Sequence, residues 1–103
     1  MIVNFEDKEY EFSLDDIDVP QARFIKRKFG MTLMDLENGL GEADPDALVA
    51  LYWLMQNQNG VTVDPDKVNF KLVRFGIALK DAVVADNEAN PTDQPDEATA
   101  SQT

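Results

Sequence analysis

Residues 44–60 read DPDALVALYWLMQNQNG, and this stretch decides the fold. Its acid-proline-acid start is typical of a helix, because a carboxylate caps free N–H groups and proline suits the first turn. Residues 47–55 are all apolar, so every face of the predicted helix is hydrophobic. Such a helix is buried by neighbours on more than one side. We therefore expect a central helix that ends near Gln58, before Gly60, with Trp53 as a core anchor.

Two helices are predicted upstream of this central helix. The first runs from Val19 to Phe29, with an acid and a proline at its start and Gly30 as its stop. The second is shorter, runs from Leu33 to about Leu40, and is capped by Thr32. We interpret it as a spacer between the larger helices. One face of the first helix carries Ala22, Ile25 and Phe29.

A last helix is predicted from about Pro65 to Ala85, because Asp64-Pro65-Asp66 is a third start of the same type. Its core-facing stripe would consist of Val68, Leu72, Phe75 and Leu79. The alternation of Val68, Phe70 and Leu72 leaves a strand as the alternative there. The cap and the continuing stripe favour the helix.

The first fourteen residues have the pattern of a β-hairpin. Val3 and Phe5 alternate with polar residues, and the polar run Glu6-Asp7-Lys8 separates them from a second alternation. That second run consists of Tyr10, Phe12 and Leu14. An isolated hairpin is marginal in water, so its apolar face must pack on the helices that follow.

Residues 86–103 read DNEANPTDQPDEATASQT and contain five acids, two prolines and no large apolar residue. Such a segment does not repay the entropy of ordering, so we expect a disordered acidic tail. The chain therefore divides into a domain at 1–85 and a tail at 86–103. The expected fold class is mainly α (α+β): a small bundle of about four helices preceded by an N-terminal β-hairpin.

The composition of the 103 residues argues against several classes of protein. The net charge of -11 repels nucleic-acid phosphates, and no apolar run is long enough to span a bilayer. Histidine and cysteine are absent, and no phosphate-binding loop, dinucleotide fingerprint or hydrolase elbow occurs. We expect a non-enzymatic protein without cofactor or secretory signal, which works by binding other proteins.

Two acidic clusters have part of the composition of a cation site. They are Asp15, Asp16 and Asp18, and Asp64, Asp66 and Asn69. Neither cluster has the glycine turn and distal glutamate of a calcium loop. We interpret both as helix-capping residues, and we expect no metal site.

The predicted partner-binding residues come from two helices. A second apolar row on the last helix comprises Phe70, Val73 and Ile77, and Phe24 lies off the main stripe of the first helix. One small core does not easily bury both rows, so one row is a candidate contact surface. The basic residues Arg23, Lys26 and Arg27, with Lys28 beside them, are the second candidate; a solvated helix face is the alternative.

The segments EYEFSLDDIDVPQARFIKRKFGMTL, DPDALVALYWLMQNQNG and VNFKLVRFGIAL follow one another between residues 9 and 79. In order and residue type they resemble the tail assembly chaperones of long-tailed phages of actinobacterial hosts. The resemblance implies a protein of the host cell cytoplasm, absent from the mature virion, that keeps the tape measure protein soluble and helps recruit tail tube subunits.

In that family a ribosomal frameshift often adds a longer product that shares the N-terminal domain, so the resemblance names that product as a further partner. The apolar rows also leave a homo-oligomer open. Two other functions stay open at the level of sequence. One is an acidic inhibitor that mimics DNA, which rests on net charge alone, and the other is a minor structural protein of the virion.

Overall fold

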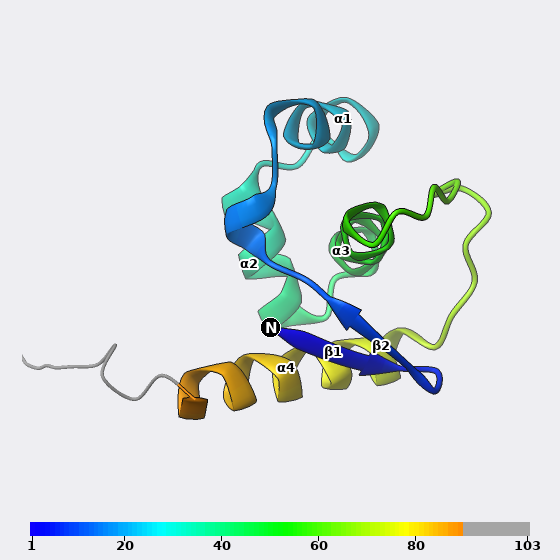
Figure 1. Ribbon diagram of the computed structural model, residues 1–103. Helices are drawn as coiled ribbons and strands as arrows, with labels where there is room; N and C mark the ends of the chain where they lie inside the picture. The colour runs from blue at the N-terminus through cyan, green and yellow to red at the C-terminus, as the bar shows by residue number, and fades with distance from the viewer. Residues whose placement is uncertain (90–103) are drawn as a thin grey trace, which may run out of the picture.

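The computed structural model describes the backbone of residues 1–89 and the side chains of residues 1–86. The predicted fold class is confirmed: a two-stranded antiparallel hairpin is followed by four α-helices, with a short 3-10 helix between them. The elements are β1 (Ile2–Phe5), β2 (Lys8–Glu11), η1 (Leu14–Asp16), α1 (Val19–Phe29), α2 (Leu33–Glu42), α3 (Pro45–Gln58) and α4 (Leu72–Ala89), as Figure 1 shows.

Helix α3 lies at the centre of the fold, between α1 on one side and the hairpin with α4 on the other (Figure 1). Within the apolar run 47–55, every side chain is buried except Val49 and Tyr52, which are half-buried. Trp53 is buried, as predicted for a core anchor. The Asp44 carboxylate accepts a hydrogen bond from the Ala47 N–H at 3.1 Å and caps the helix.

Helices α1 and α2 both begin with a reciprocal capping box. The Asp18 carboxylate accepts from the Gln21 N–H at 2.9 Å, and the Gln21 side-chain oxygen accepts from the Asp18 N–H at 3.1 Å. Thr32 and Asp35 repeat this arrangement at the start of α2. Each pair satisfies two N–H groups that have no partner inside the helix. The predicted bounds of α1 are confirmed.

The interpretation of α2 as a spacer was wrong, because this helix packs closely on α3. Leu36 is buried, and a Cβ built on Gly39 would lie only 2.3 Å from the Ala47 Cβ. The absence of a side chain at Gly39 lets the two helices approach. Helix α2 also extends two residues beyond its predicted end and stops where Ala43 takes a left-handed conformation.

The hairpin is closed by a two-residue turn, Glu6 and Asp7, both with positive φ. This turn brings Phe5 opposite Lys8. Val3 and Phe5 are buried beneath the sheet, against α4. The second alternation ends earlier than predicted, since Leu14 lies in η1 and is exposed.

The predicted start of the last helix at Pro65 was wrong, because α4 begins at Leu72. Asp64 and Asp66 form a turn, in which the Asp64 carboxylate accepts from the Asp66 N–H at 3.0 Å. Residues 68–71 continue as irregular chain to the helix, and a strand does not form there. The sequence Asp64-Pro65-Asp66 therefore forms a turn and not the start of a helix. It lies in the segment that connects α3 with α4, which packs on the hairpin.

Helix α4 ends at Ala89, so residues 86–89, which the sequence assigned to the disordered tail, are helical. The rest of the predicted tail, residues 90–103, lies outside the described residues. The core-facing stripe of α4 is confirmed at Leu72, Phe75 and Leu79, which are half-buried or buried. Val68, the fourth predicted member, is half-buried in the segment before the helix.

Candidate protein-binding surface

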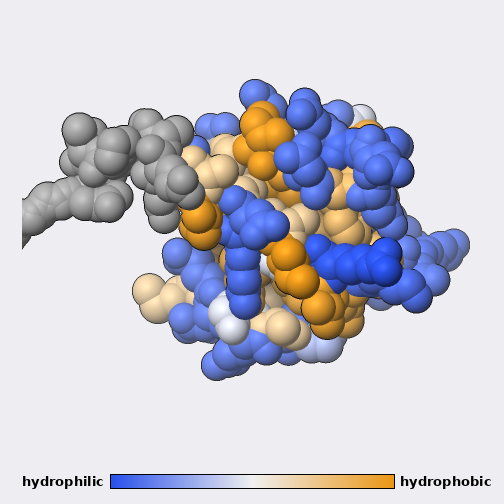
Figure 2. Space-filling model, turned by 90° about the horizontal axis from the view of Figure 1, so that it is seen from below, coloured by the Kyte–Doolittle hydropathy of each residue, from blue (hydrophilic) through white to orange (hydrophobic). Residues whose placement is uncertain are grey.

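Helix α4 carries an apolar row on the face opposite the core. Val73, Ile77 and Val84 are 70%, 53% and 56% exposed, whereas Phe75 and Leu79 between them are buried. The spacing of four and seven residues keeps the three side chains on one line along the helix. Figure 2 looks at the underside of the molecule, where apolar side chains alternate with hydrophilic ones along α4. We call these three residues the α4 row.

Charged residues border the α4 row. Arg74 and Asp81 flank it on one side, and Lys80 on the other; all three are exposed. The one ion pair formed within the described part of the chain joins Lys28 and Asp66, so Arg74, Lys80 and Asp81 have no charged partner there. An apolar stripe with unpaired charges at its rim is the composition of many protein-binding surfaces.

Two residues predicted for the partner surface are half-buried and pack on aromatic rings of the fold. Phe24 is half-buried and stacks on Trp53, with ring centroids 4.4 Å apart and an interplanar angle of 21°. Phe70 is half-buried and stacks on Tyr52 at 4.5 Å and 24°. Phe70 lies before α4 and also contacts Phe5 and Phe75 edge-on. The row of Phe70, Val73 and Ile77 predicted from helical spacing therefore does not exist as a single row.

The aromatic cluster around Phe70 also affects a titratable group. Burial among these rings raises the pKa of the Tyr52 phenol, because the charged phenolate loses hydration there. A hydrogen bond with Gln56 opposes this shift of the pKa. The side-chain amide of Gln56 also donates to the Tyr10 hydroxyl at 3.2 Å, so this buried amide has a hydrogen-bond partner.

The basic residues of α1 form a separate surface. Arg23, Lys26 and Arg27 are exposed, and Lys28 pairs with Asp66. In Figure 1, α1 and α4 lie at opposite ends of the molecule, with α3 between them. The five predicted partner-binding residues that are exposed are therefore divided between two distant surfaces, with two of them on α4 and three on α1. The α1 end also exposes the apolar side chains Val19, Leu33 and Met34.

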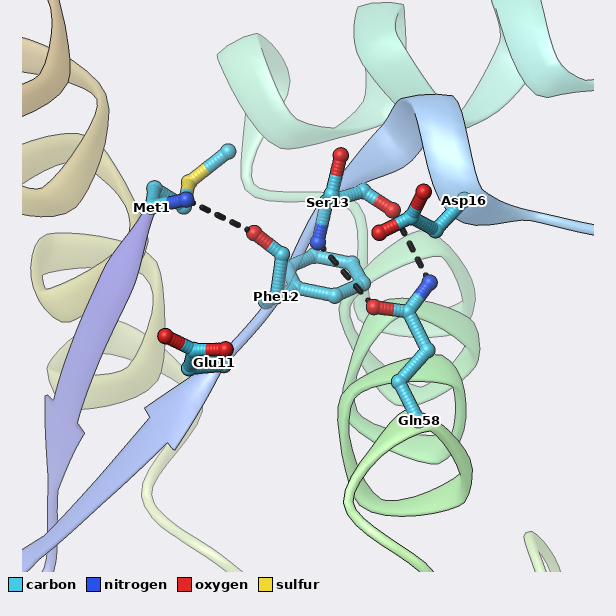
Figure 3. A pocket seen from close by; sticks show the side chains of 6 residues that line it. All are labelled: Met1, Glu11, Phe12, Ser13, Asp16 and Gln58. Carbon is cyan, nitrogen blue, oxygen red and sulfur yellow. Dashed lines mark hydrogen bonds between the residues drawn. The ribbon is translucent and has the colours of Figure 1, made fainter.

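The hollow shown in Figure 3 lies where the chain after the hairpin meets the end of α3. It has a volume of about 370 Å³. Two of its lining residues are joined there: the Ser13 N–H donates to the Gln58 side-chain oxygen at 3.0 Å, and the Gln58 amide donates back to the Ser13 carbonyl at 2.8 Å. The N-terminal amine of Met1 donates to the Phe12 carbonyl at 3.0 Å. These contacts join the chain after the hairpin to α3 and join the two ends of the hairpin to one another.

The acidic residues are not all helix caps as predicted, because Asp15 and Asp16 lie exposed within η1. Asp18 caps α1, Asp64 accepts from the backbone in a turn, and Asp66 pairs with a lysine. At α2, hydrogen bonds from the backbone and hydroxyl of Thr32 lower the pKa of the Asp35 carboxyl. Among the described residues, no group of three or more histidine, cysteine, aspartate or glutamate side chains is arranged to hold a metal ion.

Sequence reasoning found Val73 and Ile77 but missed the rest of the α4 surface. Val84 completes the row, and Arg74 and Asp81 border it at a separation of seven residues. The signal was present, because positions 73, 77, 80 and 84 are spaced by four, three and four residues. The predicted row stopped at Ile77 because it was counted from Phe70, which lies before the helix.

Comparison with known proteins found no matching family model, no matching curated protein and no matching solved structure. None of the helices in the described part of the chain has the length and hydrophobicity needed to cross a bilayer.

Proposed function

We propose that this chain is a tail assembly chaperone, which binds the tape measure protein of a long-tailed phage, keeps it soluble and helps recruit tail tube subunits. The observation that supports the proposal is the α4 row, an apolar surface along one helix that the described fold leaves uncovered. The proposal combines this surface with the resemblance between residues 9 and 79. It places the protein in the host cell cytoplasm and outside the mature virion.

The α4 row has the dimensions suited to a helical client. From Val73 to Val84 the row runs eleven residues, or about 16 Å along the helix axis, which equals three turns. A client helix with apolar residues at intervals of three and four would bury these side chains and cover its own apolar face. Tape measure proteins are long and helix-rich, so they offer many such segments.

The positions of three acids argue against the alternative of a DNA mimic. A mimic needs carboxylates in ordered rows on the folded surface. Here Asp18 and Asp44 accept hydrogen bonds from the first turns of α1 and α3, and Asp35 accepts one from the N-cap residue of α2. Their role in capping accounts for them without a nucleic-acid-binding target. No structural observation favours a virion subunit, which would be detected in purified particles.

Co-expression with the tape measure protein of the same genome tests the proposal. The soluble fraction of the tape measure protein should rise when the chain is present, and the two should purify together. Val73→Asp should abolish the effect, because it places a charge in the apolar contact. Met34→Asp is the matched control, since Met34 on α2 is 68% exposed and Val73 is 70% exposed.

Two results would contradict the proposal. The first is a tape measure protein that stays insoluble with the wild-type chain and forms no complex with it. The second is equal loss of solubility with both aspartate variants, which would mean that the α4 row has no special part in binding. Circular dichroism of each purified variant confirms that a loss does not come from unfolding.

A further inference from the structure

The charges on α4 are divided by sign between the two halves of the helix. Its first turn contains Arg74 and no acid, with Lys71 just before it, and its last turn contains no base. Asp81 and Asp86 lie in its second half. A cation in the first turn of a helix is unfavourable beside the helix dipole, and α4 is basic in its first half and acidic in its second. Such a helix is better accommodated by an antiparallel neighbour with the same pattern, whose acidic half lies beside its basic half.

The positions of Arg74 and Asp81 also fit a neighbour of this kind. They are seven residues apart, which is two turns or about 10 Å along the axis, so they do not pair within one helix. Both border the α4 row on the same side. In an antiparallel helix pair, residues that flank the contact on the same side of the two helices face one another.

From this self-complementarity we infer that two copies of the chain pair through α4, antiparallel, about a two-fold axis near Ala78 and Leu79. Val73 of each copy packs on Val84 of the second copy. Ile77 is covered by the aliphatic stem of Lys80 of the second copy. Arg74 forms an ion pair with Asp81 of the second copy, and symmetry repeats this pair. The second copy thus covers all three residues of the α4 row and gives Arg74 and Asp81 their missing partners.

The pairing itself does not depend on the identity of the client. One consequence rests on the proposed function: the client and the second copy occupy the same face, so they exclude one another. The free chain is then a dimer with a protected apolar surface, and client binding separates it. A single helix pair is a small interface, so the dimer is weak and exchanges readily.

Cysteine cross-linking gives the sharpest test, because the natural chain contains no cysteine. An equal mixture of Val73→Cys and Val84→Cys variants should form a disulfide-linked heterodimer under mild oxidation. Each variant alone should stay largely unlinked, since its two cysteines would be about 16 Å apart in the antiparallel pair. A strong link between two copies of Val73→Cys would mean parallel packing and would overturn the inference.

Charge reversal tests the ion pair in sedimentation equilibrium over a range of concentrations. Arg74→Glu or Asp81→Arg alone should raise the dimer dissociation constant by about tenfold, because each places like charges together twice. The double variant with both changes should restore dimerisation, since the pair is re-formed with the signs exchanged. Lys8→Glu, a charge reversal on the exposed hairpin, is the control and should have no effect.

The inference fails if the wild-type chain is monomeric at every concentration reached, or if the two single reversals leave the dimer unchanged. Either result would leave the co-expression test of the chaperone role untouched, because that test measures the solubility of a different protein. Loss of client solubilisation with an intact dimer would instead count against the proposed function alone.

Discussion

Phe24 of α1 stacks on Trp53 of α3, with ring centroids 4.4 Å apart and planes inclined by 21°. This contact joins α1 to the central helix and explains why an aromatic residue that lies off the main stripe of α1 is only half exposed. It also leaves only part of the Phe24 ring exposed to a partner.

The stacking predicts that Phe24→Ala destabilises the fold by about 2 kcal/mol, since the ring is half-buried and the loss is smaller than for a fully buried phenylalanine. The free energy of unfolding can be followed by the fluorescence of Trp53, the one tryptophan in the chain. Phe24→Leu should retain much of the stability. Unchanged stability together with lost client binding would show that Phe24 acts at the surface after all.

The close approach of α2 and α3 at Gly39 predicts that a single added methyl group destabilises the fold. Gly39→Ala places a Cβ 2.3 Å from the Ala47 Cβ, so α2 and α3 must move apart at a cost of about 1–3 kcal/mol. Gly41→Ala in the same helix meets nothing within 4 Å and should stabilise the fold by up to about 1 kcal/mol. Thermal unfolding of the two variants gives opposite signs; a shared sign would contradict the close approach.

The hairpin turn predicts a stabilising change. Glu6 and Asp7 have φ of 52° and 64°, a left-handed conformation that favours glycine, is tolerated by asparagine and aspartate, and is most costly for glutamate. The double change Glu6→Asn and Asp7→Gly should raise the free energy of unfolding by about 1 kcal/mol. Asp46→Gly, in the first turn of α3, is the control and should lower it. Denaturant titration measures both, and a destabilised turn variant would argue against this turn geometry.

The raised pKa of Tyr52 predicts a loss of stability in strong alkali. In the unfolded chain the phenol ionises near its ordinary pKa of about 10, whereas in the folded chain it ionises at higher pH. Its contribution is therefore fully present below about pH 10 and is lost as pH rises through the folded pKa. Denaturant midpoints measured across this window should fall more steeply for the wild-type chain than for Tyr52→Phe. Parallel curves would contradict the shift.

Local signals were sufficient for three of the four helices and for the hairpin. An acid, a proline and a glycine bracket α1 within its own segment, so its bounds could be read directly. The same kind of start at Asp64 was misleading, because Asp-Pro-Asp also suits a turn. Phe70 lies in the irregular segment before α4 and packs on Phe5 and Tyr52, which are distant in the sequence. A local pattern does not report such contacts, so it did not show that the helix begins only at Leu72.

The sequence by itself determined the mainly helical class, the buried central helix and the absence of the common catalytic motifs, since these depend on residue type and spacing along a continuous segment. Only the tertiary structure decided which apolar residues stay exposed. Phe24 and Phe70 have the same hydrophobic character as Ile77, but rings from α3 and the hairpin cover the first two and leave the third open. Burial depends on neighbours that folding brings together, and periodicity reports only on the helix that carries the residue.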